Sequence, residues 1–416
     1  MRILILSQFY DPEPITFPHE LAVGLKERGH EVSAITAIPN YPRDDFYPGY
    51  RVRPWLKEVR DGIAVLRLPL VPDHSRSSKR RILNYASFMA TSSIIAPWAS
   101  GKFDVMYVWH PPLTLGVTAW IIRLTRHIPF VYGVHDLWPE AVAVTGIANN
   151  QMLFKTLRKL ENFVYKRASA ITVISPGYKR NLIGKGVHPD KVHVLTDWAD
   201  DAIYRPVPAD QALAEESNMA GRFNVLFGGN MGPAQALETV IYAAKRLSHQ
   251  KKIQFVFAGD GMDKPRLEAL AHSQGLTNIN FLGRQPAEKM PQLYALADVL
   301  LAHFKKNPLF EISVPSKLFA YFACQRPVLM ASDGDAAQIV NQAGAGISCE
   351  AENPDALAET VLKLYNMSPD QRGQMGVRGR QAFLDQYSKD ILVRKHEEIL
   401  TEVAAHAGRK GLLKKV

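Results

Sequence analysis

The glycines that follow the apolar run at 223–227 have the spacing of a loop that could bind a ligand. Gly229 and Gly232 would let the backbone approach a ligand closely, and amides at the start of the following helix would favour negative charge. A plain tight turn would explain such a cluster equally well, so the cluster is weak evidence by itself. Together with Asn230 and Gln235, the pattern predicts a site for a diphosphate group.

Polar residues follow the later strands expected in the same half of the chain. Asp260 and Arg284 each come just after an apolar run, and Ser316 and Lys317 open a helix expected at 315–324. Because the carboxyl ends of parallel strands meet at one edge of a sheet, where ligands bind, we expect these residues to gather there. Serine and lysine at a helix start can both meet a diphosphate.

Glu311 lies just upstream of that helix. A carboxylate beside a phosphate site would be repelled, unless it accepted hydrogen bonds from sugar or ribose hydroxyls. A solvated loop carboxylate is the alternative interpretation.

In the first half of the chain, a strand expected at 129–134 ends at His135 and Asp136. Histidine at such a position can orient a hydroxyl or stabilise a transition state. A capping or core histidine is the alternative, and the same choice applies to Asp136 and Glu140. The loop after the first strand must also face the site, because it leaves the carboxyl end of that strand. The candidates to contact a ligand at this edge are Tyr10, Asp11, Glu13, Thr16, His19 and Glu140.

Basic residues precede an apolar stretch at 82–98, which favours binding to an anionic membrane surface. The alternative is a helix that buries one face against its sheet and solvates its charged end. No run is long and apolar enough to span a bilayer, so we expect any membrane contact to be peripheral. The residues assigned to this surface are Arg76, Lys79, Arg80, Arg81, Phe88 and Trp98.

Composition narrows the remaining classes. Cys324 and Cys349 are too few for a disulfide scaffold, so we expect reduced thiols in the cytoplasm, and the N-terminus is typical of a first strand rather than a secretion signal. We expect no catalytic metal, since acidic residues and histidines lack metal-ligand spacing. The net charge of +10 fits an anionic partner. Nucleic acid is disfavoured, because basic residues are not interleaved with stacking aromatics.

These residues must be positioned by strands that alternate with amphipathic helices, which predicts an α/β fold with parallel, doubly wound sheets. Strands are expected at 2–7, 31–36, 63–68, 104–108, 129–134, 170–174, 191–195, 223–227, 253–258, 278–282, 298–302, 327–331 and 345–348. Helices are expected at 18–28, 80–98, 113–125, 150–167, 176–184, 234–247, 263–273, 288–296, 315–324, 354–366, 369–385 and 388–405.

The pattern restarts once, which predicts two Rossmann-like domains. We place the first domain at 1–198, a linker at 199–222 and the second domain, which carries the expected diphosphate site, at 223–387. The segment 388–416 is expected to cross back to the first domain and to end in a basic tail.

Several segments of the second domain resemble one family. GGNMGPAQALETV, FAGDG, NINFLGR, LYALADVLL and PSKLFAYFACQRPVL are similar to the donor domain of family 4 glycosyltransferases of GT-B fold. The resemblance is strongest to the bacterial surface-polysaccharide branch, which makes colanic acid, O-antigen and capsule. ITVISPGYKRNLIGKGVHPDKVHVL and ELAVGLKERGHEVSAIT also resemble family segments, in matching order, so the resemblance covers nearly the whole chain.

The resemblance implies two Rossmann-like domains separated by a cleft, an acceptor-binding domain at 1–198 and a nucleotide-sugar donor domain at 223–387. It places on the acceptor side the six residues named above in and near the loop after the first strand and at Glu140. It implies transfer of a hexosyl or N-acetylhexosaminyl group from a nucleotide-diphosphate sugar, commonly a UDP-sugar, with retention of configuration and without a metal or other cofactor. The expected acceptor is a lipid-linked (undecaprenyl diphosphate) saccharide at the cytoplasmic face of the inner membrane. The resemblance gives catalytic roles to His135, Asp136 and Glu311, and a donor site to Gly229, Asn230, Gly232, Gln235, Asp260, Arg284, Val314, Pro315, Ser316 and Lys317.

The sequence departs from the family pattern at two places. Ala320 stands where the family has its second glutamate, the usual ribose ligand, and Glu311 is one residue out of register with the first. Pro14, Ile15 and Thr16 replace a Gly-Gly pair that touches donor and acceptor. These departures keep open two alternatives: a nucleotide-sugar epimerase of the same architecture, and a non-catalytic nucleotide-sugar binding protein.

Overall fold

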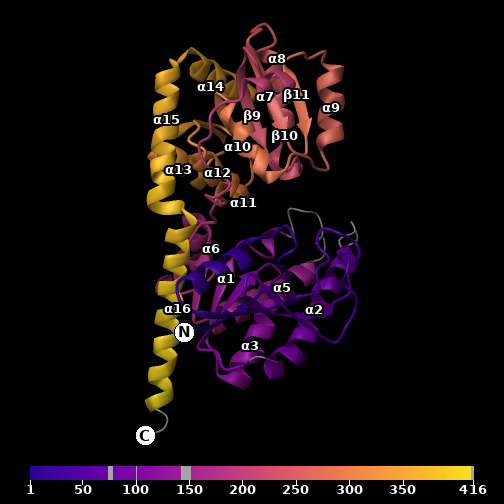
Figure 1. Cartoon of the computed structure of the whole chain (residues 1–416), viewed down its shortest axis with the longest axis vertical. Coiled ribbons are helices and arrows are strands. Elements are labelled where there is room, and N and C mark those ends of the chain that lie inside the picture. The colour runs from indigo at the N-terminus through magenta and orange to yellow at the C-terminus, as the bar shows by residue number, and fades with distance from the viewer. Residues whose placement is uncertain (74–77, 100, 142–150, 414–416) are drawn as a thin grey trace. The chain divides into compact units, whose positions relative to one another are not determined.

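The computed structural model describes residues 1–73, 78–99, 101–141 and 151–413 (Figure 1). The chain divides into two compact units, each built around one sheet. The first unit holds Met1–Leu195 and the chain from Val393 onward, and the second holds Thr196–Leu392. The architecture is α/β, as the alternation of strands and helices predicts.

The first unit contains an eight-stranded sheet in the order β3-β4-β2-β1-β5-β6-β7-β8, in which only β3 and β4 are antiparallel. Its strands are β1 (Arg2–Leu6), β2 (Glu31–Ala37), β3 (Leu56–Arg60), β4 (Ile63–Leu68), β5 (Val105–His110), β6 (Phe130–Val134), β7 (Ala170–Val173) and β8 (Val192–Val194). Its helices are α1 (Phe17–Glu27), α2 (Ser78–Ala99), α3 (Leu115–Arg126), α5 (Gln151–Arg167) and α6 (Pro176–Gly184). The central strands are continuous apolar runs and are buried along their length, which is typical of parallel strands covered on both faces.

The second unit contains a six-stranded parallel sheet in the order β11-β10-β9-β12-β13-β14. Its strands are β9 (Phe223–Gly228), β10 (Ile253–Ala258), β11 (Ile279–Gly283), β12 (Val299–His303), β13 (Val328–Ala331) and β14 (Gly346–Cys349). Its helices are α7 (Gln211–Glu216), α8 (Glu238–Arg246), α9 (Lys264–Ser273), α10 (Met290–Ala295), α11 (Pro308–Glu311), α12 (Lys317–Ala323), α13 (Asp335–Gln342), α14 (Pro354–Asn366) and α15 (Pro369–Ala382).

The strand order of each sheet places the loops that carry function. The order reverses between β1 and β5 in the first sheet and between β9 and β12 in the second. Ligands of open α/β sheets bind at the carboxyl ends of the strands beside such a reversal, because the connections there leave on opposite faces. A ligand site is therefore expected in the loops after β1, β5, β9 and β12.

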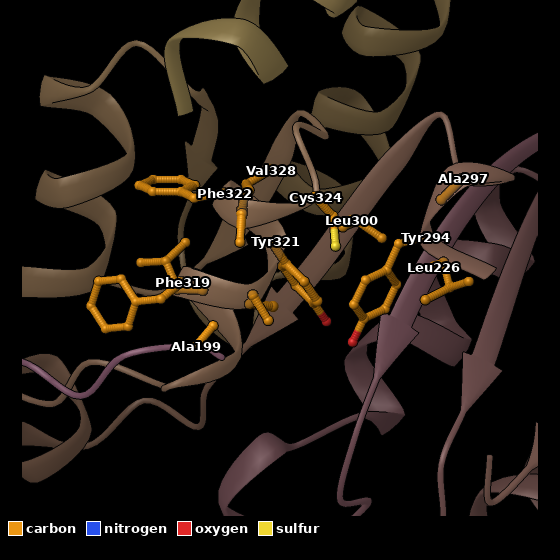
Figure 2. Close-up of a cluster of buried hydrophobic side chains, with 14 of the residues drawn as sticks. Ala199, Leu226, Tyr294, Ala297, Leu300, Phe319, Tyr321, Phe322, Cys324 and Val328 are labelled. Atoms are coloured by element: carbon orange, nitrogen blue, oxygen red, sulfur yellow. The ribbon is translucent and has the colours of Figure 1, made fainter. Parts of the chain in front are cut away.

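The core of the second unit supports the loop that follows β9. Figure 2 shows Tyr294 and Tyr321 packed among apolar side chains, with their hydroxyl ends directed toward one another. The hydroxyl of Tyr321 accepts the Gly228 N–H at 3.0 Å and donates to the Leu301 carbonyl at 3.1 Å. One tyrosine thus ties the end of β9 to the neighbouring strand.

The segment predicted to be a linker, 199–222, belongs to the second unit. Its polar composition conceals α7, whose first turn is capped by the Asp210 carboxylate, and Leu213 and Met219 are buried in the core of that unit. The helix predicted at 234–247 is interrupted, because Ala236 has a φ of 41° and ends a short 3-10 turn before α8 begins. The short strand β3 and helix α13 were not predicted.

The last helix, α16 (Lys389–Leu413), begins in the second unit and continues in the first. In the first unit it packs against α1. A Cβ on Gly24 would lie 3.0 Å from the side chain of Val393, and the carboxylate of Glu397 contacts both Arg28 and His30. No helix in the described residues is long and apolar enough to cross a bilayer.

Candidate active site

The glycine-rich loop after β9 is pinned to the loop after β10. The Gly229 N–H donates to the Ala258 carbonyl at 2.9 Å, and the Met231 N–H donates to the Asp260 carbonyl at 2.8 Å. A Cβ on Gly259 would lie 1.9 Å from the Gly229 carbonyl oxygen. The glycines are therefore needed for close packing of two loops, and Gly229 also has a φ of 121°.

This packing corrects the sequence-based account of the diphosphate site. We expected the amides of the glycine loop to bind phosphate, but those of Gly229 and Met231 have acceptors within the protein. The Gly232 N–H donates to the side-chain oxygen of Gln235 at 3.1 Å, so Gln235 is occupied as well. Most of the negative charge of a diphosphate must then be met by side chains, while the exposed Asn230 remains available.

Lys317 is the side chain best placed for that role. It is the first residue of α12, and its Nζ lies 3.8 Å from the centre of the Phe227 ring. The same nitrogen is 3.1 Å from the position that a Cβ on Gly229 would take. Burial lowers the pKa of Lys317 to about 7. The structure thus brings the lysine and the glycine loop together, with the ammonium close to the loop backbone.

Residues beside Lys317 contribute in different ways. Ser316 is exposed at the N-cap of α12 and makes no capping hydrogen bond, so its hydroxyl remains available to a ligand. Val314 is buried and Pro315 is half-buried, so these two shape the loop rather than offer polar groups.

Arg284 and Asp260 lie in loops at the same edge of the second sheet. Arg284 is exposed just after β11, and no carboxylate in the described part of the chain pairs with it. Asp260 is exposed, and its carboxylate accepts the Gly261 N–H at 2.9 Å. An unpaired guanidinium here can bind phosphate or carboxylate oxygens in a bidentate geometry.

Glu311 ends the short helix α11 and is half-buried. Its backbone is held by Gly334, where a Cβ would lie 2.0 Å from the Glu311 carbonyl oxygen and where φ is 99°. Ala320 is 6% exposed within the apolar core, so nothing at that position can bind a ribose hydroxyl. Glu311 is the remaining acidic residue of the family pattern.

In the first unit, His135 lies at the carboxyl end of β6. Its N–H donates to the His110 carbonyl at 3.3 Å, and its half-buried ring packs edge-on against Phe17 at 4.5 Å and beside Trp109 at 5.3 Å. Asp136 follows and is exposed. The histidine therefore stands among aromatic rings at the edge where an acceptor would bind.

Sequence reasoning missed His110, which lies in the apolar run of β5. The side chain is 1% exposed, neither ring nitrogen has a partner among the described residues, and burial lowers its pKa to about 3. A neutral imidazole directly beside the backbone of His135 is thus part of this edge. The only sequence signal is a polar residue at the end of an otherwise apolar strand.

The acceptor-side assignments separate into accessible and structural residues. Thr16 is exposed, and Asp11 is half-buried, 3.5 Å from Arg60. Tyr10 is fully buried, Glu13 is 3% exposed, and His19 pairs with Asp61 at 2.8 Å. The buried pair, Tyr10 and Glu13, therefore cannot contact an acceptor directly.

Glu140 also loses its assigned role. Its carboxylate pairs with Arg158 at 2.9 Å and with Lys185 at 3.0 Å, and both cations also contact the buried Glu161. Glu140 therefore belongs to an ion-pair network between α5 and α6.

The basic and apolar stretch at 76–98 forms most of α2, and its two faces differ. Phe88 is fully buried, which corrects its assignment to a membrane surface, because that face packs toward α3, where the Ser92 and Thr118 hydroxyls meet at 2.9 Å. Trp98 is 86% exposed. Arg80 is exposed, 3.9 Å from Asp73, and Arg81 is half-buried. Arg76 and the side chain of Lys79 lie outside the described residues.

No group of three or more acidic, histidine or cysteine side chains in the described residues is arranged to hold a metal ion. Lys317 and Arg284 supply positive charge in the second unit, at the edge of the sheet where the strand order reverses. A phosphorylated ligand fits this arrangement.

Most of the chain matches two known domain families. Residues 14–198 match the glycosyl transferase 4-like domain, and residues 222–367 match the glycosyl transferases group 1 domain. The chain therefore belongs to the glycosyltransferases, and its two α/β units are of GT-B type.

Two curated relatives resemble most of the chain. The chain is 26% identical over 330 residues to WbjE of Pseudomonas aeruginosa, named as a glycosyltransferase, covering 77% of this chain and 81% of that protein. It is 29% identical over 336 residues to WcaI of Escherichia coli (strain K12), named for colanic acid biosynthesis, covering 76% and 80%. The crystal structure of Anabaena Alr3699/HepE in complex with UDP superposes with a TM-score of 0.71 at 16% identity, over 97% of this chain and all (100%) of that one.

Proposed function

We propose that this glycosyltransferase moves a sugar from a UDP-sugar to a lipid-linked saccharide in the synthesis of a bacterial surface polysaccharide such as O-antigen or capsule. The sugar would be a hexose or an N-acetylhexosamine, and the product would retain the configuration of the donor. The observation that carries the proposal is the Lys317 amine, desolvated against Phe227 and next to the glycine loop.

The proposed reaction begins when an acceptor hydroxyl attacks the anomeric carbon of the donor sugar. The bond from that carbon to the diphosphate oxygen breaks, and the hydroxyl proton passes to the departing diphosphate. Lys317 and Arg284 would neutralise the charge that develops on the diphosphate, which lowers the barrier electrostatically. His135 would orient the acceptor hydroxyl, and Glu311 would bind hydroxyls of the sugar or the ribose.

No step in this path requires a protein nucleophile or a metal ion. The charge that a metal would neutralise is matched by the lysine and the arginine, and side chains in the described residues form no cluster that could hold a cation. We therefore propose that turnover persists in a chelator.

The choice of UDP is supported by the complexes of Alr3699/HepE with UDP and with UDP-glucose. At 16% identity that likeness shows the fold alone, so the nucleotide remains part of the proposal. WcaI and WbjE support a saccharide acceptor.

An exposed stripe on α2 supports peripheral binding to the cytoplasmic face of the inner membrane. Leu83, Ile94 and Trp98 are 51%, 68% and 86% exposed. Their spacing places them on one side of the helix over roughly 22 Å, and Arg80 lies at the basic end of the same stripe. Apolar depth next to positive charge suits an anionic lipid surface.

A thermal-shift screen of nucleotides tests the donor assignment. UDP and UDP-sugars should raise the melting temperature at concentrations where GDP and ADP do not. Donor consumption with and without a saccharide acceptor then separates transferase from the alternatives. Product formation without acceptor would indicate an epimerase, and tight binding without any turnover would indicate a binding protein.

A further inference from the structure

Glu13 joins two loops at the carboxyl edge of the first sheet. One of its carboxylate oxygens accepts the N–H groups of Asn40 and Tyr41, both at 2.8 Å, and the other accepts the Tyr10 N–H at 3.0 Å. The side chain is 3% exposed. Because Tyr10 follows β1 and Asn40 follows β2, a single buried carboxylate fixes the ends of two neighbouring strands to one another.

Arg67 of β4 holds the same two loops from the other side. Its guanidinium is fully buried and donates to the Asp11 carbonyl, to the Ala37 carbonyl at 3.2 Å and to the Glu58 carboxylate at 2.6 Å. Glu13 and Arg67 therefore form a brace in which each buried charge is satisfied by several partners.

The braced loop leads to the candidate acceptor edge through a short series of contacts. After Glu13 the chain continues through the exposed Thr16 to Phe17, the first residue of α1. The Phe17 ring packs 4.5 Å from the His135 ring. A displacement of the loop would thus move both an exposed hydroxyl and the packing partner of the histidine.

We propose that Glu13 is a positioning residue for the acceptor substrate: it touches no ligand and holds the loops 7–16 and 38–42 in the conformation that binds the acceptor saccharide. This inference rests on the proposed function, because that function places the acceptor on the first unit. Pro14, Ile15 and Thr16 stand where the family has glycines, which fits a loop whose conformation is fixed by the buried Glu13 and Arg67.

Two opposing effects act on the charge of Glu13. The three N–H groups that face it favour the ionised carboxylate, because its oxygens accept from all three. Burial raises the pKa of Glu13 to about 7, although the three N–H groups and Arg67 act to lower it. The titratable groups around it are Arg67 from β4, Tyr10 and Asp11 from its own loop, and Tyr47.

The sign of the pH effect follows from that pKa. Folding raises the pKa of Glu13 above its ordinary value of 4.5, so the braced conformation binds a proton more tightly than an opened loop in which the carboxyl group meets water. The braced conformation should therefore become more stable, relative to the opened one, as the pH falls through about 7. Above pH 7 the loops are held against the cost of a buried charge, so they should open more readily there.

Hydrogen exchange tests the brace without any need for activity. In Glu13→Gln the remaining oxygen can still accept from Asn40 and Tyr41, while the new amide group faces the Tyr10 N–H. Exchange in the segment around Tyr10 should rise roughly tenfold, the cost of one lost buried hydrogen bond. Glu31→Gln is the matched control, because Glu31 is exposed at the opposite end of β2.

The wild-type protein provides a second measurement, so a failure of the variant to fold does not end the test. After correction for the intrinsic rate, exchange in the same segment should fall between pH 8 and pH 6, because protonation of Glu13 favours the closed loops. Either of two results would overturn the brace: exchange at the wild-type rate in Glu13→Gln, or exchange in the wild-type segment that does not depend on pH.

Kinetics test the positioning role. Glu13→Gln should raise the acceptor KM by roughly tenfold while leaving UDP-sugar binding unchanged. Loosened loops with an unchanged acceptor KM would refute the role in positioning. Absence of transfer by the wild type to any saccharide would instead refute the proposed function, and the exchange result would still decide whether Glu13 braces the loops.

Discussion

At the scale of single residues, Lys317 is held in surroundings that disfavour its own charge. Its amine lies against the Phe227 ring, and its pKa is lowered to about 7 because burial removes water from the ammonium. An anionic ligand would stabilise the ammonium charge that burial destabilises, so Lys317 is suited to bind a diphosphate. Replacement by Met should weaken UDP-sugar binding and reduce kcat/KM by at least about 100-fold, as for loss of a charged hydrogen bond.

Stability provides the control for that substitution. Removal of a desolvated ammonium should not destabilise the protein, so Lys317→Met should melt no lower than the wild type without ligand. Isothermal titration calorimetry measures the loss of affinity. Wild-type binding and turnover in the variant would exclude Lys317 from the donor site.

The lowered pKa of Lys317 predicts that the protein takes up a proton when it binds the UDP-sugar. The free amine is largely neutral at pH 8, and a bound diphosphate raises its pKa, so UDP-sugar binding at pH 8 should draw close to one proton from the buffer. The dissociation constant should then rise roughly tenfold per pH unit above pH 7. Calorimetry in buffers of different ionisation enthalpy measures the uptake. Equal uptake in Lys317→Met would assign the proton to another group.

At the scale of elements, the sequence predicted the strands best where apolar residues predominate. β4 and β10 have the predicted bounds, because each is apolar at all positions but one, Arg67 in β4 and Gln254 in β10. The antiparallel edge strand β3 escaped prediction, since Lys57 and Val59 are exposed and little of it is buried. The segment 199–222 escaped because its few buried residues, such as Leu213, are scattered among polar ones.

Part of the candidate site could also be predicted from the sequence. Residue types and strand ends placed Lys317 and Arg284 at the carboxyl edge of the sheet, because parallel topology alone fixes where strand ends meet. Hydrogen bonding between loops could not be predicted. The sequence alone therefore did not reveal that the glycine amides are occupied, that Glu13 is buried, or that Glu140 is paired with Arg158.

The close packing of the loops after β9 and β10 predicts the effect of adding one methyl group at Gly259. Gly259→Ala places a Cβ 1.9 Å from the Gly229 carbonyl oxygen, so the glycine loop must move. We expect UDP-sugar affinity to fall at least about tenfold, with a loss of stability of about 1–3 kcal/mol from overpacking. Gly373→Ala is the matched control, because that glycine lies in α15 with nothing within 4 Å of the added Cβ. Equal donor affinity in both variants would contradict the close packing of the loops.

At the scale of the whole molecule, membrane binding should depend on the exposed stripe of α2. Replacement of Leu83, Ile94 and Trp98 by Ser should release the protein from phosphatidylglycerol vesicles in a sedimentation assay. Leu124→Ser is the control, because Leu124 is 53% exposed on α3.

Charge should contribute separately to the same binding. Replacement of Arg76, Lys79, Arg80 and Arg81 by Ser should weaken it by about 1 kcal/mol per residue, and added salt should weaken wild-type binding. Binding that survives both sets of substitutions, or a wild type that never sediments with vesicles, would rule out this surface.

The central proposal is that this glycosyltransferase transfers a sugar with retention and without a metal. Proton NMR of a reaction containing a UDP-sugar, a saccharide diphosphate lipid and EDTA tests it most directly. The account predicts that UDP appears only when acceptor is present, and that the new anomeric proton has the coupling constant of the donor configuration. An inverted anomeric centre, or turnover that EDTA abolishes and a divalent cation restores, would contradict it.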